Sequence, residues 1–216
     1  MKRKQWLAFA FIIFLATVIW FIYGQMHATN RDLSTLTGTT LLEAVQAKPR
    51  LDEAEVDDLQ ARAEWSAVEL ALSQQKFDPT ARQMAIAAST GPLTTVAAYL
   101  QQGISPFELV DGVPALASVF NENGDPEKWQ GVLELVEDER LIQLTVDELN
   151  LEATKQLFAK GYTVPDEEQI TILLQPIRHN QVELTQLLLE HGAVWSPIHD
   201  ETARAYGSDL ILKMKR

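Results

Sequence analysis

The residues best suited to chemistry are four histidines and several short acidic runs, since the chain has no cysteine. His179, His191 and His199 lie near one another in the sequence, whereas His27 stands alone near the N-terminus. None has a histidine partner four residues away or the HExxH setting of a zinc hydrolase. The histidine pattern therefore predicts no metal site.

Acidic runs occur at 52–53, 137–139 and 166–168, and each is explained as a solvated helix end. Residues 121–125 resemble the start of a calcium loop, but the closing Glu is missing. No GxSxG, GxGxxG or phosphate-binding glycine loop is present. The sequence thus predicts no enzyme and no cofactor.

The elements that would position these residues are pairs of short amphipathic helices. Residues 84–105 predict a helix, a turn at Gly91 and a second helix with apolar residues at spacings of three and four. The second helix should end at Gly103 in the left-handed conformation. Similar helices should end at Gly161 and Gly192, which lie 31 residues apart. A period near 30 with paired helices is typical of a solenoid.

At these positions the chain resembles the ankyrin-repeat family. Residues 84–103 follow its register of first helix, glycine turn, second helix and terminal glycine, and residues 173–193 follow it again, with Asn180 in place of the turn glycine. Asn tolerates the left-handed conformation well. The resemblance covers roughly residues 64–216 and looks like a divergent, bacterial-type, membrane-anchored member. It implies an all-α solenoid of about four to five degenerate repeats that presents a binding surface rather than an active site.

In such a solenoid the loops after the second helices contribute to the binding face. Here these loops span 104–112, 162–169 and 193–201, and run 166–168 should project three carboxylates beside Tyr162. Aromatic residues with charged neighbours are typical of protein interfaces. Packing between repeats is an equally good interpretation for two of the aromatics, Phe107 and Trp195. The predicted partner-binding residues are Phe107, Glu108, Tyr162, Asp166, Glu167, Glu168, Trp195 and His199.

The N-terminal stretch predicts a membrane anchor. After the basic cluster 2–4, residues 6–23 run for 18 positions without a charge. At about 1.5 Å per residue, this is long enough for a thin hydrocarbon core. The preceding basic residues place the N-terminus in the cytoplasm. A cleaved signal peptide is the alternative, but its apolar region would be shorter and the cleavage site is poor. We therefore expect a single-pass inner-membrane protein whose bulk lies outside the cytoplasm, in the periplasm if the source is Gram-negative.

This gives a predicted domain order along the chain. Residues 1–24 form the cytoplasmic tip and anchor, 25–40 a linker, 41–80 an N-terminal helical cap, 81–197 the ankyrin-like repeats and 198–216 a C-terminal cap. Polar capping units are what the ends of a solenoid require.

The net charge of the chain indicates which classes of partner are favoured. The net charge is −12, and since residues 1–30 hold three basic residues and no acidic one, residues 31–216 carry 15 Lys and Arg against 30 Asp and Glu. Nucleic acid is disfavoured by such a surface. A basic protein partner is favoured, although an acidic surface also serves solubility. We expect a membrane-anchored, exported protein-interaction module without catalytic activity, attached to the lipid bilayer through residues 6–23. The alternative is an immunity protein or inhibitor that neutralises a basic toxin or enzyme outside the cytoplasm.

Overall fold

A computed structural model describes residues 17–18, 32–121 and 124–214 of the 216-residue chain. The described residues are mostly helical, with twelve α-helices among them. The chain divides between Pro79 and Thr80 into two compact units, named here unit 1 and unit 2. This division lies next to the predicted boundary between the helical cap and the repeats.

The predicted membrane anchor is not supported. Within the ranges that the structure describes, no helix has the length and apolar character needed to cross a bilayer. Apart from Thr17 and Val18, residues 6–23 lie outside the described residues, as do His27, residues 25–31 of the predicted linker and the end of the C-terminal cap. Because a span needs about 20 consecutive apolar helical residues, this finding overturns the transmembrane part of the fold prediction. The predicted single-pass inner-membrane location is overturned with it.

Unit 1 contains a 3₁₀-helix, η1 (Leu33–Thr35), and three α-helices, α2 (Gly38–Ala47), α3 (Glu53–Ala61) and α4 (Trp65–Ser73). The sequence predicted one helical stretch from 51 to 76, but α3 and α4 are separated at Ala63, which has a φ of 57°. The α4 helix packs against both α2 and α3. Arg62 joins α3 to η1, because its guanidinium donates to the Leu36 carbonyl at 2.9 Å and to the Leu33 carbonyl at 3.0 Å.

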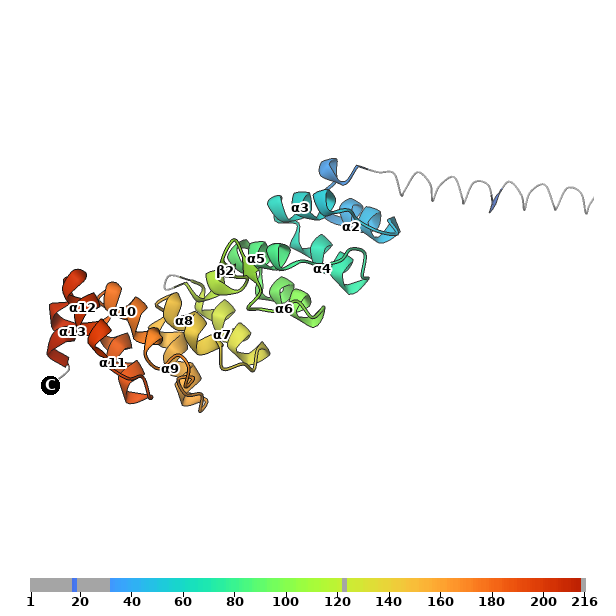
Figure 1. The fold of residues 1–216 in the computed structure, drawn as a ribbon. Coiled ribbons are helices and arrows are strands. Elements are labelled where there is room, and N and C mark those ends of the chain that lie inside the picture. The colour runs from blue at the N-terminus through green and yellow to red at the C-terminus, as the bar shows by residue number, and fades with distance from the viewer. Residues whose placement is uncertain (1–16, 19–31, 122–123, 215–216) are drawn as a thin grey trace, which may run out of the picture. The chain divides into compact units, whose positions relative to one another are not determined.

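Unit 2 is built from five consecutive helical pairs among the residues described (Figure 1). The first members are α5 (Ala81–Thr90), the 3₁₀-helix η2 (Ala117–Phe120), α8 (Leu141–Asp147), α10 (Leu174–Arg178) with the preceding 3₁₀-turn η3 (Thr171–Leu173), and α12 (Pro197–Ala205). The second members are α6 (Leu93–Gln101), α7 (Pro126–Leu135), α9 (Leu151–Ala159), α11 (Val182–Glu190) and α13 (Asp209–Met214). We call these the first-helix row and the second-helix row.

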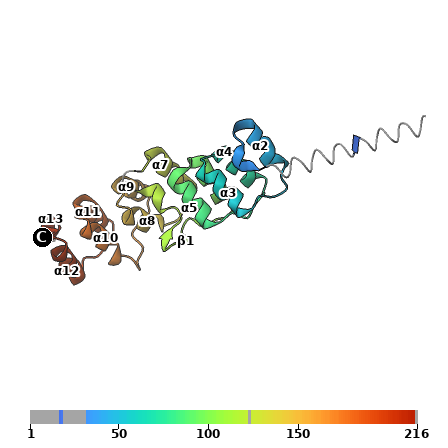
Figure 2. The same cartoon turned by 90° about the horizontal axis from the view of Figure 1, so that it is seen from above.

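Each row is continuous through unit 2. The contacts run from α5 to η2, α8, α10 and α12 in one row, and from α6 to α7, α9, α11 and α13 in the other. Figure 2 shows α8, α10 and α12 along one side of the unit and α7, α9 and α11 along the other. The side chains between the rows form the core; fully buried examples are Met84, Tyr99, Leu116, Phe120, Leu141, Ile142, Leu157, Leu173, Ile177, Leu188 and Ile211.

Several helices of unit 2 begin at residues that favour a helix N-terminus. Thr80 and Gln83 form a capping box at the start of α5. The Gln83 amide donates to the Thr80 hydroxyl at 3.3 Å, and the Thr80 amide donates to the Gln83 side-chain carbonyl at 3.1 Å. The Asn150 side chain accepts from the Ala153 amide at the start of α9. Pro126 and Pro197 stand in the first turns of α7 and α12, where proline is tolerated. These N-terminal residues determine where α5, α7, α9 and α12 begin.

Three of the second helices end at a glycine in the left-handed backbone conformation. Gly103, Gly161 and Gly192 have φ values of 84°, 92° and 107°, which confirms the predicted C-caps. Asn180, with a φ of 53°, takes the left-handed turn between α10 and α11 as predicted. Gly91 was expected to have a positive φ, but its φ is −87°, so the turn between α5 and α6 is made by extended backbone.

The loop between the first two pairs contains a short β-hairpin that the sequence analysis read as plain loop. Strands β1 (Leu109–Val110) and β2 (Val113–Pro114) pair antiparallel, with Leu109 opposite Pro114. The two residues between the strands, Asp111 and Gly112, have φ values of 54° and 84°. Two positive φ values at an Asp-Gly turn are what a type I′ hairpin requires.

Polar side chains also join successive pairs at the ends of the first helices. The Lys128 ammonium on α7 donates to the carbonyls of Ala87, Ala88 and Gly91 at 3.0, 2.5 and 2.6 Å. Asn150 donates to the carbonyl of Phe120, the last residue of η2 in the preceding pair, at 3.0 Å. In the last pair, the Ser208 hydroxyl donates to the Ile177 carbonyl at 2.7 Å. Carbonyls at the ends of the first helices thus accept hydrogen bonds from side chains of the next pair along the chain.

A substitution at Gly103 tests whether α6 ends in a left-handed C-cap. A Cβ at this position would have no heavy atom within 4 Å, so the Gly103→Val variant should suffer from backbone strain alone. We expect its free energy of unfolding to fall by about 1–2 kcal/mol. The control is Gln101→Val at an exposed position on α6, which should cost a few tenths of a kcal/mol, about the difference in helix propensity. Urea unfolding of both variants measures the difference, and equal losses would contradict the left-handed C-cap.

A substitution at Lys128 tests how much the hydrogen bonds between neighbouring helical pairs stabilise the protein. Its side chain is half-buried, and Lys128→Met keeps the apolar stem but removes the donor from three carbonyls. We expect a loss of about 1–3 kcal/mol in the free energy of unfolding, because these buried acceptors lose their partner. Lys155→Met on α9 is the control, since Lys155 makes an exposed ion pair with Glu152 that should contribute little. Equal stability of the two variants would show that the Lys128 bonds do not hold the pairs together.

Candidate protein-binding surface

The loops that join one helical pair to the next lie against one another along unit 2. Arg140, between the second and third pairs, lies over the ring of Phe107, between the first and second, at 4.1 Å from the ring centre. Farther along, the Val194 amide donates to the Gln169 carbonyl at 2.8 Å, which joins the last two loops. Residues that are distant in the sequence therefore share one loop edge.

The last two loops expose a cluster of large aliphatic side chains. Ile170, Val194 and Ile198 are 46%, 46% and 47% exposed. Their backbones are held together because Gln169 pairs with Val194, and because the ring of His199, next to Ile198, bonds to the Ile170 carbonyl at 2.8 Å. We name these three residues, together with exposed Asp166 and Glu167 in the same loop as Ile170, the 166–198 surface.

The rings of Trp195 and His199 contact each other next to this surface and are shielded from solvent in part or completely. The Trp195 ring meets the His199 ring edge-on at 5.3 Å between centres, and its Nε1–H donates to Asp200 at 3.2 Å. Trp195 is half-buried, and His199 is fully buried with 0% of its surface exposed. His199 therefore holds the loops together and has no exposed surface for a direct partner contact, although the sequence analysis placed it in the contact set.

Acidic side chains gather beside the third pair. Burial raises the pKa of the Glu168 carboxyl, and the negative charges of Asp147, Glu167 and Glu139 raise it further. Burial likewise raises the pKa of Asp147, against a hydrogen bond from Gln143 at 2.7 Å, which lowers it. One oxygen of Glu168, Oε2, is shielded from water and has no hydrogen-bond partner. The cluster carries repulsion that a proton or a nearby cation would relieve.

The first loop is a separate region of the edge. Phe107 is half-buried and packed against Arg140, whose guanidinium also binds the Asp138 carboxylate at 2.9 and 2.6 Å. Glu108 is exposed beside the hairpin, and its carbonyl accepts from the Ala115 amide at 2.9 Å. The hairpin exposes Leu109 and Val113 to 65% and 51%.

The structure brings together only part of the predicted set. Asp166, Glu167, Trp195 and His199 converge at the last two loops, while Phe107 and Glu108 belong to the first. Tyr162 is half-buried, and its amide bonds to the Leu157 carbonyl at the end of α9, so it mainly completes a helix end. Sequence reasoning missed the exposed aliphatic residues: Leu109, Val113, Ile170, Val194 and Ile198. Their signal was available, since large apolar residues in expected loops are unusual, and Asp111-Gly112 marks a hairpin.

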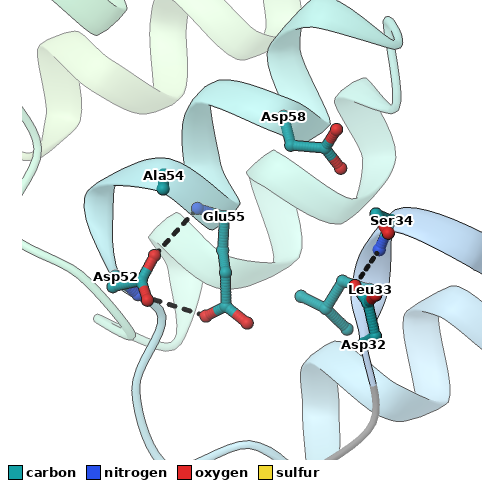
Figure 3. Close-up of a pocket in the computed structure, with 7 residues that line it drawn as sticks. All are labelled: Asp32, Leu33, Ser34, Asp52, Ala54, Glu55 and Asp58. Carbon is teal, nitrogen blue, oxygen red and sulfur yellow. Dashed lines mark hydrogen bonds between the residues drawn. The ribbon is translucent and has the colours of Figure 1, made fainter.

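Unit 1 contains a pocket of about 280 Å³ with four carboxylates (Figure 3). It lies where η1 meets the first turns of α3. Its lining residues are Asp32, Leu33, Ser34, Asp52, Ala54, Glu55 and Asp58.

Each carboxylate of this pocket already has a structural partner. Asp32 accepts from Ser34, and this hydrogen bonding lowers the pKa of Asp32. Asp52 and Glu55 accept from each other's amides at the start of α3, and Glu55 also pairs with Lys48. Asp58 pairs with Arg62 at 2.9 Å. The pocket is therefore explained by ion pairs and by helix-capping hydrogen bonds, the latter drawn as dashed lines in Figure 3.

No group of three or more His, Asp or Glu side chains within the described ranges is arranged to hold a metal ion. Two residues of the sequence resembling a calcium loop, 122 and 123, lie outside those ranges. Comparison with known proteins gave no matching family model, no similar curated protein and no similar solved structure. The resemblance to ankyrin repeats therefore stays a prediction.

The acidic cluster predicts how stability depends on pH. A carboxyl whose pKa is raised in the folded state stabilises the protein below its usual pKa, and this stabilisation is lost as the pH rises through the folded pKa. The charge on Glu168 therefore disfavours folding at neutral pH, and Glu168→Gln should raise the free energy of unfolding at pH 7 by about 0.5 kcal/mol or less, since water screens the partly exposed group. At pH 4, below the usual value of 4.5, the difference should vanish.

Chemical denaturation of both proteins between pH 4 and pH 8 measures this effect. The matched control is Glu152→Gln, which removes an exposed carboxylate that pairs with Lys155 on α9. The control should not gain stability at neutral pH. A Glu168→Gln protein that is less stable than the wild type at pH 7 would show that the carboxylate is stabilised by its surroundings instead of repelled.

Proposed function

We propose that unit 2 is a protein-binding helical-repeat module of the ankyrin type, which docks its partner on the 166–198 surface. The observation that carries the proposal is the exposure of Ile170 and Val194 on two adjacent loops and of Ile198 in the first turn of α12, segments that a backbone hydrogen bond and the His199 ring hold together. A cluster of large exposed aliphatic side chains with a polar rim is typical of an interaction site.

The ankyrin assignment draws on the arrangement of the pairs. Helical pairs follow one another in two rows, a hairpin occupies the first connecting loop, and left-handed glycines end the second helices at Gly103, Gly161 and Gly192. These are features of a solenoid whose loops and first helices make an extended binding face. The proposal involves no catalytic step.

Charge favours a partner that combines apolar and basic residues. Asp166 and Glu167 flank the aliphatic cluster, and the acidic side chains of Asp147, Glu139 and Glu168 repel one another nearby. In the described part of the chain, these five carboxylates make no ion pair with Lys or Arg. A partner that places Lys or Arg beside them would steer toward the surface and relieve their repulsion.

The partner can be identified by placing a photo-crosslinking residue at Ile198 in the full chain and recovering the attached protein. The same residue at Glu183, exposed on α11 in the second-helix row, is the control. A partner that attaches at Ile198 and not at Glu183 supports the proposed surface. If the recovered protein is a basic enzyme or toxin whose activity falls on binding, the module acts as an inhibitor; if it has no activity to block, the module acts as a scaffold.

Charge reversal on the recovered complex makes the proposal quantitative. Asp166→Lys with Glu167→Lys should lower the association rate severalfold, and the loss should shrink as salt rises, because these exposed charges act by steering. Glu168 is left unchanged, since its Oε2 points away from water. Surface plasmon resonance at low and high salt measures both rates.

The matched control is Glu152→Lys with Glu183→Lys, which reverses two exposed charges on the second-helix row. The control should bind as the wild type does. If the control abolishes binding and the loop variant does not, the partner docks on the second-helix row and the proposed surface is wrong.

A further inference from the structure

A buried histidine joins the last helical pair to the loop before it. His199 lies in the first turn of α12, and its ring spans two neighbours. Its Nδ1 accepts from the backbone amide of Ser196 at 2.9 Å, and its Nε2 lies 2.8 Å from the Ile170 carbonyl. The ring therefore links the start of α12 to a loop residue 29 positions earlier.

These two contacts determine the protonation state of the ring. A backbone amide can only donate, so Nδ1 must carry a lone pair, and a carbonyl can only accept, so Nε2 must carry the hydrogen. His199 is therefore neutral in this arrangement. A second proton could go only to Nδ1, where its N–H would face the N–H of Ser196. Protonation thus replaces the 2.9 Å bond from the Ser196 amide with a repulsive contact and leaves Nδ1 only the longer contact to the Ser196 hydroxyl, at 3.4 Å.

We propose that His199 is a pH-sensitive latch: the neutral ring fastens the α12–α13 pair to the 163–170 loop, and its protonation at mildly acidic pH releases that pair. The rest of unit 2 remains folded, because the Asn150 and Lys128 links lie in earlier pairs. Ile170 and Ile198 then separate, so the exposed aliphatic cluster is dismantled.

The surroundings of the ring favour the neutral form. Burial lowers the pKa of His199, while the bond to the Ile170 carbonyl and the negative charge of Asp200 raise it less strongly. Asp200 is itself engaged with Trp195. The elements packed against α12 carry further titratable or charged groups, none of which is close enough to reverse this balance: Glu167 and Glu168 in the loop, Arg178 and His179 at the end of α10, and Asp209 and Lys213 on α13.

The direction of the pH effect follows from linkage. When the folded pKa of a histidine is lowered, its contribution to stability is present above the usual value of 6.5 and is lost as the pH falls toward the folded pKa. Over that window the equilibrium constant for opening should rise about tenfold per pH unit. The acidic cluster acts in the opposite direction, since Glu168 and Asp147 favour folding at lower pH. A local measurement and a non-titrating variant separate the two effects.

Hydrogen–deuterium exchange on the full chain, with intrinsic rates corrected at each pH, provides the local measurement. In the wild type, peptides from 197–214 should lose protection severalfold as the pH falls from 6.5 to 5.5, while peptides from 81–101 should not change. In His199→Gln the loss should be absent. Glutamine is the usual third-position residue of a capping box, so it can accept from Ser196 and donate to Ile170 without titrating.

His199→Phe keeps a buried ring but makes neither bond, so its 197–214 peptides should be as poorly protected at pH 7.5 as the wild-type peptides are at pH 5.5. Loss of protection with the same pH dependence in the wild type and His199→Gln would overturn the latch, because the glutamine cannot take up a proton. Full protection of 197–214 in His199→Phe at neutral pH would also overturn it. Neither readout requires a binding partner, so these results are independent of the protein-binding proposal.

Discussion

Unit 2 depends on the fact that a pair of helices of ten residues or fewer cannot bury its own apolar faces. Every pair leaves one face open, and only the next pair can cover it, as α8 does for η2 and α10 does for α8. The same holds for the backbone at the helix ends. Carbonyls at the end of α5 and at its C-cap Gly91 are not all paired by the helix itself, and Lys128 of the next pair supplies three hydrogen bonds there. Apolar burial and carbonyl pairing therefore both act between neighbours.

This nearest-neighbour dependence shapes the candidate surface. Because each loop must return the chain to the start of the next first helix, successive loops meet along one edge, and short backbone or side-chain contacts join them. The Gln169–Val194 bond and the Arg140–Phe107 stacking are two such contacts. Exposed side chains on neighbouring loops are held at fixed positions, which lowers the entropy that a partner must remove on binding. The edge is thus rigid enough to recognise a partner, although it is made of loops.

The α12–α13 pair is the last pair that the structure describes. It packs on the preceding pair through contacts of α12 with α10 and of α13 with α11, together with polar contacts. His199 and Ser208 supply two of them, and both bond to carbonyls of the preceding pair or its loop. A titratable residue in one of these positions makes the last pair responsive to pH, whereas Asn150 performs a similar linking role in the interior without any charge change. The location of the histidine at the end is therefore consistent with local release instead of global unfolding.

Sequence patterns determined much of the local structure. The apolar spacing of 93–100 gave the helix α6, and Gly103, Gly161 and Gly192 marked the left-handed ends correctly, because both signals act within a few residues. The signals were incomplete where alternatives of similar energy exist. Gly91 permits a positive φ but does not require one, and the helical propensity of 51–76 concealed the break at Ala63.

Only the tertiary structure decided which residues are exposed on the loop edge. His199 and Ile198 are neighbours in the sequence, yet one is fully buried and the other is 47% exposed, because the ring turns toward the Ile170 carbonyl 29 residues earlier. Glu167 and Glu168 are likewise adjacent, yet Glu167 is exposed whereas one oxygen of Glu168 is buried. The sequence determined that the chain carries amphipathic helical pairs with acidic and aromatic loops. The identity of the exposed residues depends on contacts between pairs, and such long-range contacts leave no local periodicity from which they could be predicted.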